Sequence, residues 1–350
     1  MKKRRILVIY TGGTFGMDET LKIPKLSPQA LRKRLLTQVP EMSRMVDCDV
    51  QIVFNTDSCQ MNSGHWFELA AHLKAHQDNY DGAVILHGTD TLAYSAAALS
   101  LLLGANPIPV VITGAQKPLA MLRNDARSNF ISALEVAAFA PKELQNRVMV
   151  VFHDELFLGS RVRKKSALSF SAFESPRFPR LAQIGSTIQY EGILKNLPKL
   201  KSSTFSNPLG HSKAYSSRIL SAEITPEFPS SLFSTALLQE VDGIILTLYT
   251  SGTAPTGNAE FVQFLERAKA NCVPIYAITE REDAPAELSN YQAGKELLNE
   301  GVLWCRDLTP EAAFVKSWLL RAGRPKNESK EKYFSWLKKN WEKAISDETS

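Results

Sequence analysis

Two adjacent glycines directly after an apolar strand constrain this chain more than any other feature of its sequence. Residues 5–9 read Arg-Ile-Leu-Val-Ile, an apolar run typical of a parallel strand buried on both faces. The segment Thr11-Gly12-Gly13-Thr14 follows, and its glycines permit a tight turn that bulkier residues do not tolerate. Ligands bind at the carboxyl ends of strands in open α/β sheets. The segment is therefore either an ordinary strand-to-loop turn or the beginning of a binding site.

Strand-like and helix-like segments alternate through the first part of the chain. Ser27 and Pro28 read as the N-cap and first residue of a helix. The predicted strands are 5–9, 50–55, 82–86, 108–112 and 147–152, and the predicted helices are 28–39, 65–77, 92–103 and 124–140. This alternation predicts a parallel sheet that is covered by helices on both faces.

Small and polar residues follow four consecutive predicted strands. They are Thr11-Gly12-Gly13-Thr14, Asp57-Ser58, His87-Gly88-Thr89-Asp90-Thr91 and Thr113-Gly114. Because the carboxyl ends of parallel strands lie along one edge of a sheet, we expect these segments to converge there and to form a ligand site. Neither G-x-x-x-x-G-K-[ST] nor G-x-G-x-x-G occurs, so no phosphate-binding loop is predicted.

The chain beyond the fifth predicted strand divides into a loop, a linker and a second domain. Residues 156–173 are polar, basic and rich in serine, which predicts a long loop. Residues 194–213 read as a linker between an N-terminal domain, 1–193, and a C-terminal α/β domain, 214–350. In the second domain the predicted strands are 220–224, 243–249, 273–279 and 302–304, and the predicted helices are 231–239, 256–270, 293–299 and 310–320. Residues 328–345 predict an amphipathic helix that docks on its own domain or on a partner.

Composition and charge exclude several classes of protein. The 41 Lys and Arg residues are nearly balanced by 36 Asp and Glu, and a net charge of +5 is too diffuse for a nucleic-acid-binding face. No apolar run approaches a membrane span, and the basic start precedes too few apolar residues for a signal peptide. The cysteines at 48, 59, 272 and 305 have neither CxxC spacing nor a metal-binding pattern. We therefore expect a cytoplasmic protein with free thiols, no metal, and no nucleic-acid or membrane partner.

The segment His87-Gly88-Thr89-Asp90-Thr91 has two interpretations. In one, Asp90 is an N-cap for the helix predicted from residue 92, and His87 is an ordinary buried histidine. In the other, Asp90 binds the ammonium group of a ligand and Thr89 faces the reacting centre. A threonine hydroxyl reacts at neutral pH only when a neighbouring base or cation activates it. Lys164 is a candidate for that group, and the alternative for Lys164 is a solvated basic loop.

Taken together, these motifs resemble those of the bacterial-type L-asparaginase family. The resemblance rests on Thr11-Gly12-Gly13-Thr14 after a hydrophobic strand, with His87-Gly88-Thr89-Asp90-Thr91 further along. Thr113-Gly-Ala-Gln-Lys-Pro118 and Arg123-Asn-Asp125 are most similar to the cytoplasmic, type I branch. The likeness covers residues 4–193 well and the second domain more loosely. It implies two domains: a larger N-terminal flavodoxin-like parallel sheet with helices on both faces, and a smaller C-terminal Rossmann-like α/β domain.

The resemblance also implies a set of catalytic residues. Thr14 matches the primary nucleophile, which attacks the side-chain amide of asparagine and forms an acyl-enzyme with release of ammonia. Thr89, Asp90 and Lys164 match a second triad that activates water or the nucleophile. N–H groups near Gly88 and Thr89 match an oxyanion hole, which usually contributes most to acyl transfer. This mechanism needs neither a metal nor a cofactor.

A second group of residues matches the substrate-binding positions of the family. Ser58 matches the residue that holds the α-carboxylate, and Asp90 also matches the one that holds the α-ammonium. Asp57, Gly88 and Thr89 are assigned to the same pocket. Cys59 stands where relatives have Ser or Gln near the α-amino group, which predicts altered specificity.

The sequence departs from the family at three further places. A loop tyrosine that hydrogen-bonds the nucleophile is replaced by Lys22, so either another group such as Lys22 activates Thr14 or turnover is impaired. Thr279-Glu-Arg281 stands where type I enzymes have Thr-Gln-Cys, which puts their allosteric asparagine site in doubt here. Thr253 replaces a common Asn in the loop that reaches the site from a neighbouring protomer.

The resemblance implies hydrolysis of L-asparagine to L-aspartate and ammonia by a homodimer or homotetramer. One alternative is an amidase subunit that supplies ammonia to a transamidation partner, as in archaeal glutamyl-tRNA amidotransferase. A second is a catalytically weak amino-acid-binding or regulatory protein, which Lys22 favours. A third is a preference for L-glutamine or D-amino-acid substrates, which Cys59 favours.

Overall fold

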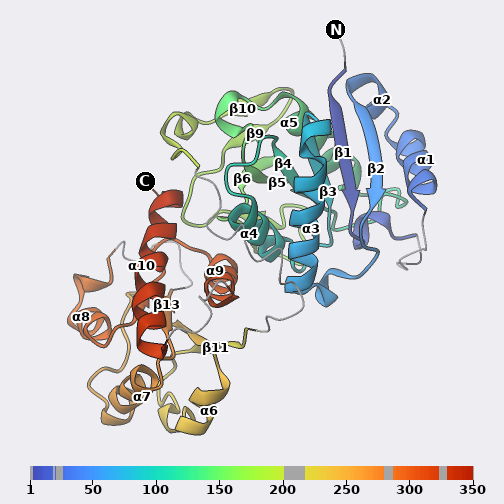
Figure 1. Ribbon diagram of the computed structural model, residues 1–350. Helices are drawn as coiled ribbons and strands as arrows, with labels where there is room; N and C mark the ends of the chain where they lie inside the picture. Colours follow the sequence, from blue (N-terminus) through green and yellow to red (C-terminus); the bar gives the residue numbers. More distant parts are fainter. Residues whose placement is uncertain are drawn as a thin grey trace. The chain divides into compact units, whose positions relative to one another are not determined.

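The chain folds into two compact units, Met1–Leu209 and Gly210–Ser350, in a computed structural model. The structure describes residues 3–18, 20, 27–200, 217–279, 287–322 and 329–349. Each unit is built on its own sheet, mostly parallel in the first unit and wholly parallel in the second (Figure 1).

The first unit contains an eight-stranded sheet in which the first five strands are parallel. These strands are β1 (Arg5–Tyr10), β2 (Asp47–Ile52), β3 (Gly82–Leu86), β4 (Val110–Thr113) and β5 (Val148–Phe152). They pair in the order β2-β1-β3-β4-β5, which is the flavodoxin-like order expected from the resemblance. The fully apolar sequence of β3, buried along its whole length, explains why its bounds could be predicted without error.

Three antiparallel strands extend this sheet beyond β5, and they were not predicted from the sequence. They are β6 (Glu155–Leu158), β9 (Ala182–Ile184) and β10 (Ile188–Tyr190), paired in the order β5-β6-β9-β10. The long loop predicted over 156–173 is therefore wrong in part. That region begins inside β6 and also holds a two-residue ladder between β7 (Arg163–Lys164) and β8 (Phe173–Glu174). Strands this short carry too little period-two pattern to be recognised in a sequence.

Helices cover both faces of the first sheet, as predicted (Figure 1). They are α1 (Pro28–Gln38), α2 (Met42–Met45), α3 (Ser63–His76), α4 (Leu92–Leu103) and α5 (Ala126–Phe139). Ile6, Val8 and Tyr10 of β1 share one buried cluster with residues of α1 and α5. On the other face α3 and α4 pack together, and Trp66 donates a hydrogen bond to the Ser95 hydroxyl over 3.2 Å.

Local chemistry sets where these helices begin. Ser27 caps α1 by accepting a hydrogen bond from the backbone N–H of Ala30, with Pro28 in the first position, as predicted. Asn62 and His65 form a capping box at the start of α3. Short 3₁₀ turns occupy η1 (Thr14–Gly16), η2 (Ser58–Gln60), η3 (Gln77–Asn79), η4 (Lys142–Leu144) and η5 (Gly192–Asn196).

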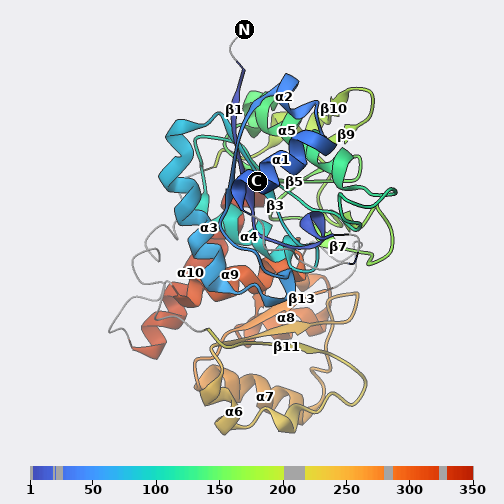
Figure 2. The ribbon, with the colours of Figure 1, turned by 90° about the vertical axis from the view of Figure 1, so that its right-hand side faces the viewer.

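The second unit contains a four-stranded parallel sheet. Its strands β11 (Ile219–Glu223), β12 (Gly243–Thr247), β13 (Ile275–Ile278) and β14 (Leu303–Trp304) pair in chain order. The helices are α6 (Thr235–Glu240), α7 (Ala259–Ala270), α8 (Gln292–Asn299), α9 (Pro310–Ala322) and α10 (Lys330–Thr349). Figure 2 shows α6 and α7 on one side of this sheet and α9 and α10 on the other. The helix predicted over 231–239 starts later, because η7 (Ser230–Leu232) comes first and Ser234 caps α6.

The amphipathic helix predicted at the end of the chain is α10, and it docks on its own unit. Tyr333, Leu337 and Trp341 are buried. The Trp341 indole N–H donates to the carbonyl of Trp304 over 3.1 Å, and the Lys316 ammonium lies 4.8 Å from the centre of the Trp341 ring. Within the described part of the chain, no helix has the length and apolar character that crossing a membrane requires.

Candidate active site

The reversal of strand order between β1 and β3 positions the candidate site. β2 and β3 lie on opposite sides of β1. The connection after β1 leads to β2 on one side, and the connection after β3 leads to β4 on the other side. Such a switch point opens a crevice at the carboxyl ends of the strands. Three of the polar segments singled out in the sequence lie here, after β1, β2 and β3.

Glycines bring these segments into direct contact. Gly13 adopts φ 82°, and a Cβ added to it would lie 2.4 Å from the Cα of Gly88. A Cβ added to Gly88 would in turn lie 2.6 Å from the Ser58 hydroxyl oxygen. Real side chains do not approach so closely, so glycine is required at both positions. Thr14 and Thr89, the residues that follow these two glycines, are thereby held on adjoining loops.

Thr14 begins the 3₁₀ turn η1 and is half-buried. Arg34 of α1 fastens this turn, since its guanidinium donates to the carbonyl oxygens of Gly16 and Met17 over 3.0 and 2.8 Å. Phe15 is anchored as well: its carbonyl accepts from the N–H of Leu119 over 3.2 Å. The backbone that carries the Thr14 hydroxyl is thus fixed by these contacts.

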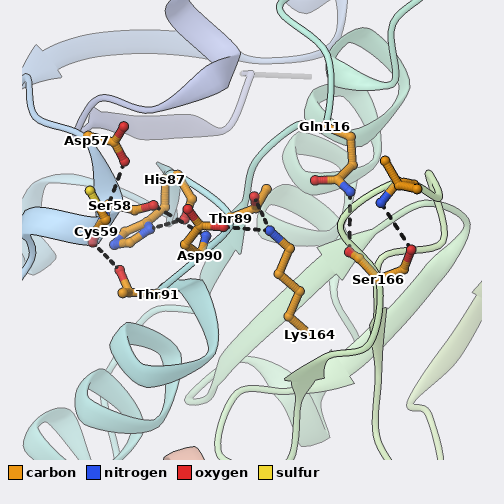
Figure 3. Close-up of polar contacts among 12 residues, drawn as sticks. Asp57, Ser58, Cys59, His87, Thr89, Asp90, Thr91, Gln116, Lys164 and Ser166 are labelled. Atoms are coloured by element: carbon orange, nitrogen blue, oxygen red, sulfur yellow. Dashed lines mark hydrogen bonds and ion pairs between the residues drawn. The ribbon is translucent and has the colours of Figure 1, made fainter.

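A lysine from a distant strand meets the second polar segment. The Lys164 ammonium donates to the Thr89 hydroxyl oxygen and to a carboxylate oxygen of Asp90, each over 2.8 Å (Figure 3). The Lys164 side chain is 19% exposed, whereas that of Asp90 is 63% exposed. Lys164 is therefore shielded behind the site, and Asp90 keeps an open face toward a ligand. A cation in contact with Thr89 favours negative charge on its oxygen.

Asp90 does not cap the helix that follows it. Thr91 is the residue before α4, and its hydroxyl donates to the carbonyl oxygen of Ser58 over 2.8 Å. The N-cap interpretation of Asp90 is therefore wrong, because its carboxylate is engaged by Lys164. The interpretation of Lys164 as a solvated lysine is wrong for the same reason.

Ser58, in the turn after β2, has 4% of its surface exposed. Its hydroxyl oxygen accepts from the backbone N–H of Asp90 over 3.3 Å, so its own O–H can donate to a ligand. Asp57 caps the turn η2 by accepting from the N–H of Cys59 over 3.1 Å. The thiol of Cys59 is exposed beside this turn.

His87 is fully buried behind the second polar segment. Its Nδ1–H donates to the carbonyl oxygen of Gly88 over 2.7 Å, which fixes the neutral tautomer and steadies the peptide that leads to Thr89. The other ring nitrogen has no partner among the described residues. Burial lowers the pKa of His87 to about 4, since a charged ring would lose its hydration there. His87 is thus a neutral support at physiological pH, but its Nε2, unpaired within the described part of the chain, sets it apart from a buried histidine with both ring nitrogens hydrogen-bonded.

No metal centre can be assigned in the residues that the structure describes. Within those residues, no group of three or more His, Cys, Asp or Glu side chains is arranged to hold an ion. The polar groups at this edge of the sheet are instead hydroxyls, the carboxylates of Asp57 and Asp90, the Lys164 ammonium and backbone N–H groups. Such a set suits a small zwitterionic ligand, which carries both a carboxylate and an ammonium.

Comparison with known proteins identifies the family. Residues 5–196 match the family model described as "Asparaginase, N-terminal", and residues 218–334 match "Glutaminase/Asparaginase C-terminal domain". The chain belongs to the asparaginase family. The L-asparaginase 1 of Escherichia coli (strain K12) is 35% identical over 328 residues, which span 90% of this chain and 91% of that protein.

Structural comparison and a further relative extend this result. The crystal structure of L-asparaginase I from Vibrio cholerae superposes with a TM-score of 0.78 at 31% identity, over 96% of this chain and 97% of that one. The two-domain α/β fold expected from the resemblance is therefore confirmed. A component of the glutamyl-tRNA(Gln) amidotransferase from Methanobrevibacter smithii is 29% identical, over 91% of this chain and 72% of that protein. The chain is thus a member of a family of amidohydrolases.

Some of the positions that distinguish this chain from its family lie outside the described residues. They are Lys22 and the pair 280–281. Residues 201–213 of the predicted linker also lie outside the described residues. The domain boundaries at 193 and 214 therefore stay a prediction.

Sequence reasoning did not single out three residues that shape the site. Arg34 holds the turn of Thr14, Gln116 contacts the loop that follows Lys164, and Asp125 holds Gln116. Gln116 and Asp125 lie in segments that carried the family resemblance, but their spacing alone indicated no function.

Proposed function

We propose that this chain is an L-asparaginase, which hydrolyses L-asparagine to L-aspartate and ammonia through a threonine acyl-enzyme. The observation that carries the proposal is the crevice at the β1–β3 switch point, where the loops of Thr14 and Thr89 adjoin and Lys164 contacts both Thr89 and Asp90. Membership of the asparaginase family supports the reaction class.

In the first half-reaction Thr14 is the nucleophile. Its oxygen attacks the side-chain amide carbon of the substrate, the carbon–nitrogen bond breaks, and the hydroxyl proton leaves with the departing ammonia. The N–H groups near Gly88 and Thr89 stabilise the negative oxygen of the tetrahedral intermediate. Water then attacks the aspartyl ester, which releases L-aspartate and restores the Thr14 hydroxyl.

Thr89, Asp90 and Lys164 act together as the proton-handling group. The contacts of the Lys164 ammonium orient the Thr89 hydroxyl and stabilise negative charge that develops on it. General acid–base groups of this kind typically contribute on the order of 10²–10⁴-fold to a rate. The roles assigned from the family resemblance to Thr14, Thr89, Asp90 and Lys164 remain proposals that mutagenesis can test.

The substrate backbone is held by the segment after β2. The O–H of Ser58 donates to the α-carboxylate, and the exposed carboxylate of Asp90 accepts from the α-ammonium. Asp57 and Cys59 line the approach to these groups, and Cys59 replaces the Ser or Gln expected from the family resemblance. We therefore propose that Cys59 tunes selectivity among L-asparagine, L-glutamine and D-asparagine.

An ammonia-supplying amidase component is a second candidate function. The similarity to a component of a glutamyl-tRNA(Gln) amidotransferase supports it, although this chain corresponds to 72% of that relative's length. The third candidate function is that of a catalytically weak amino-acid-binding protein. The replacement of the loop tyrosine by Lys22 supports it. We further propose a homodimer or homotetramer, as implied by the resemblance, and a cytoplasmic location, supported by the free thiols of Cys48 and Cys59.

Ammonia release by the purified protein tests the proposal. L-asparagine, L-glutamine and D-asparagine are compared for the wild type and for Lys22→Tyr, and the mass of the protein in solution is measured alongside. The proposal predicts ammonia from L-asparagine by a lone homo-oligomer. Release from no substrate, with activity gained in Lys22→Tyr, would instead support an amino-acid-binding protein. Release that requires a second protein would support the amidase component.

A further inference from the structure

Lys164 reaches the site from an element too short to hold it in place. β7 consists of Arg163–Lys164 and pairs with the two residues of β8. Even a complete two-stranded hairpin is only marginally stable alone in water, so a ladder this short needs support from its surroundings. The position of the Lys164 ammonium against Thr89 and Asp90 therefore depends on what holds this hairpin.

The loop that joins the two strands is ordered mainly by its own hydrogen bonds. The Ser166 hydroxyl oxygen accepts from the N–H groups of Leu168 and Ser169 over 3.1 and 2.9 Å. The N–H of Lys165 donates to the carbonyl of Ala172 over 2.8 Å and closes the base of the loop. These bonds give the loop a shape, but they do not attach it to the sheet.

Gln116 attaches the loop to the end of β4 by hydrogen bonds. Aromatic contacts support this attachment. The centre of the Phe173 ring in β8 lies 4.7 Å from that of the Phe152 ring in β5. The Arg123 guanidinium lies 5.8 Å from the centre of the Phe170 ring.

The Gln116 side-chain amide nitrogen donates to the carbonyl oxygen of Ser166 over 3.4 Å (Figure 3). It also donates to the carbonyl oxygen of Ser169 over 3.1 Å. The two carbonyls belong to opposite ends of the serine turn, and the first lies two residues after Lys164. A single amide thus bridges the loop on the side from which Lys164 enters the site.

Gln116 itself is held rigidly. Its backbone N–H donates to both carboxylate oxygens of Asp125, each over 3.0 Å, and Asp125 is 3% exposed. Asn129 of α5 donates to Asp125 over 3.2 Å and to the carbonyl of Gly114 over 3.0 Å. A continuous chain of hydrogen bonds therefore runs from α5, past the end of β4, to the loop behind Lys164.

We propose that Gln116 is a positioning residue, whose amide ties the β7–β8 loop to the end of β4 and so holds the Lys164 ammonium against Thr89 and Asp90. This inference rests on the proposed function for its kinetic consequence, because Lys164 is given a role only there. Gln116 is not assigned any contact with substrate. Its removal is expected to affect the chemical step more than substrate binding.

The test uses Gln116→Leu, which removes both donated hydrogen bonds and keeps a side chain of similar size. Small displacements of a positioned catalytic group cost up to about 100-fold in rate, so we expect kcat for L-asparagine to fall roughly 10- to 100-fold. KM is expected to change less than about threefold, because Ser58 and its partners are untouched. Amide hydrogen exchange in residues 165–172 is expected to become faster.

Gln183→Leu is the matched control. The Gln183 amide also donates to a backbone carbonyl in the first unit, that of Asp154, over 2.8 Å, but it bonds no residue of the crevice. Its loss should leave kcat, KM and exchange in 165–172 as in the wild type. The double variant Gln116→Leu/Lys164→Met supplies a second check, since the Gln116 change should have almost no further effect once the lysine is gone.

Equal kcat in Gln116→Leu and the wild type would overturn the inference, as would an effect on KM alone or unchanged exchange in 165–172. An effect of Gln116→Leu that persists in full in the Lys164→Met background would also overturn it. An inactive wild type would instead contradict the proposed function, and the exchange measurement then decides by itself whether Gln116 anchors the loop.

Discussion

The main sheets of the two units differ in strand order, and the candidate site follows that difference. The first sheet reverses its order around β1, with β2 on one side and β3 on the other. The second runs β11-β12-β13-β14 in chain order, so it has no such reversal. Both sheets are covered by helices, but a crevice for ligands opens where the order reverses. The difference teaches that strand order, more than strand composition, decides which sheet carries the site.

Two glycines, Gly13 in the first unit and Gly301 in the second, show a related difference. Gly13 and Gly301 have nearly equal φ angles of 82° and 86°. A Cβ on Gly13 would collide with the backbone of Gly88, whereas a Cβ on Gly301 would meet nothing within 4 Å. At Gly13, glycine therefore serves close approach between loops as well as backbone conformation. At Gly301 it serves conformation alone.

The largest difference in activity is expected when a threonine hydroxyl that follows a strand is removed from one sheet or from the other. Thr14→Ala in the first unit should reduce ammonia release from L-asparagine to background, because the acyl-enzyme can no longer form. Thr225→Ala, an exposed threonine that follows β11, should keep activity within about twofold. Circular dichroism checks that both variants fold. An active Thr14→Ala variant would remove Thr14 as the nucleophile.

The next largest effect is expected at the cation of the first unit. Lys164→Met removes the ammonium beside Thr89 and Asp90 and should lower kcat by on the order of 10²–10⁴-fold. Lys165→Met removes a neighbouring lysine whose ammonium lies 3.8 Å from Glu174 instead, and it should change kcat less than about twofold. Steady-state kinetics on both variants separates the two lysines. Equal losses would mean that general positive charge, and not the Lys164 contact, matters.

The glycine comparison predicts a smaller effect, on stability. Gly13→Ala adds a collision to a strained backbone and should lower the free energy of unfolding by about 3 kcal/mol or more. Gly301→Ala has the strain without the collision and should lose only about 1 kcal/mol. Urea unfolding of the two variants measures the difference. Equal losses would show that the loops of Gly13 and Gly88 do not need their close contact.

The smallest effect is expected in the pH dependence of the free energy of unfolding, to which the buried His87 of the first unit contributes. The folded pKa of His87 is about 4, below the usual 6.5, so between these values the unfolded chain binds the proton and folding excludes it. Stability from His87 is therefore fully present above pH 6.5 and is lost as pH falls toward 4. From pH 7 to pH 5 the loss should be about 2 kcal/mol.

A variant that lacks the ring isolates this loss. His87→Asn cannot titrate, so its urea unfolding free energy should fall less between pH 7 and pH 5 than that of the wild type. Tyr276, the corresponding buried ionisable group of the second unit, has its pKa raised by burial and stays neutral throughout this range. An identical fall in the wild type and in His87→Asn would contradict the low pKa of His87.

Much of the fold could be predicted from the sequence because its elements are long and apolar. The strand over 82–86 and the helix over 92–103 were predicted with the bounds that the structure has, since both are almost continuously buried. The antiparallel strands β6, β9 and β10 were missed because they span three or four residues each. So few residues give no periodic signal, and β6 pairs with β9 across more than 20 intervening residues.

The site could be predicted only where a motif is continuous in sequence. Ser58, Thr89 and Asp90 lie in motifs that follow strands, so topology alone brought them together. Lys164 was a candidate from a basic run, and its contact with Asp90 depends on a hairpin that no local pattern announced. Gln116 was not predicted as a site residue, because its role depends on two backbone carbonyls some 50 residues away.

Trapping of the acyl-enzyme tests the central claim most directly. The wild type is mixed with excess L-asparagine, quenched in acid and digested, and the peptides are analysed by mass spectrometry. The account predicts an aspartyl ester on Thr14, at the carboxyl end of β1 in the first unit, and none in Thr14→Ala. Ammonia release accompanied by an acyl group on Thr89, or on any residue of the second unit, would contradict it.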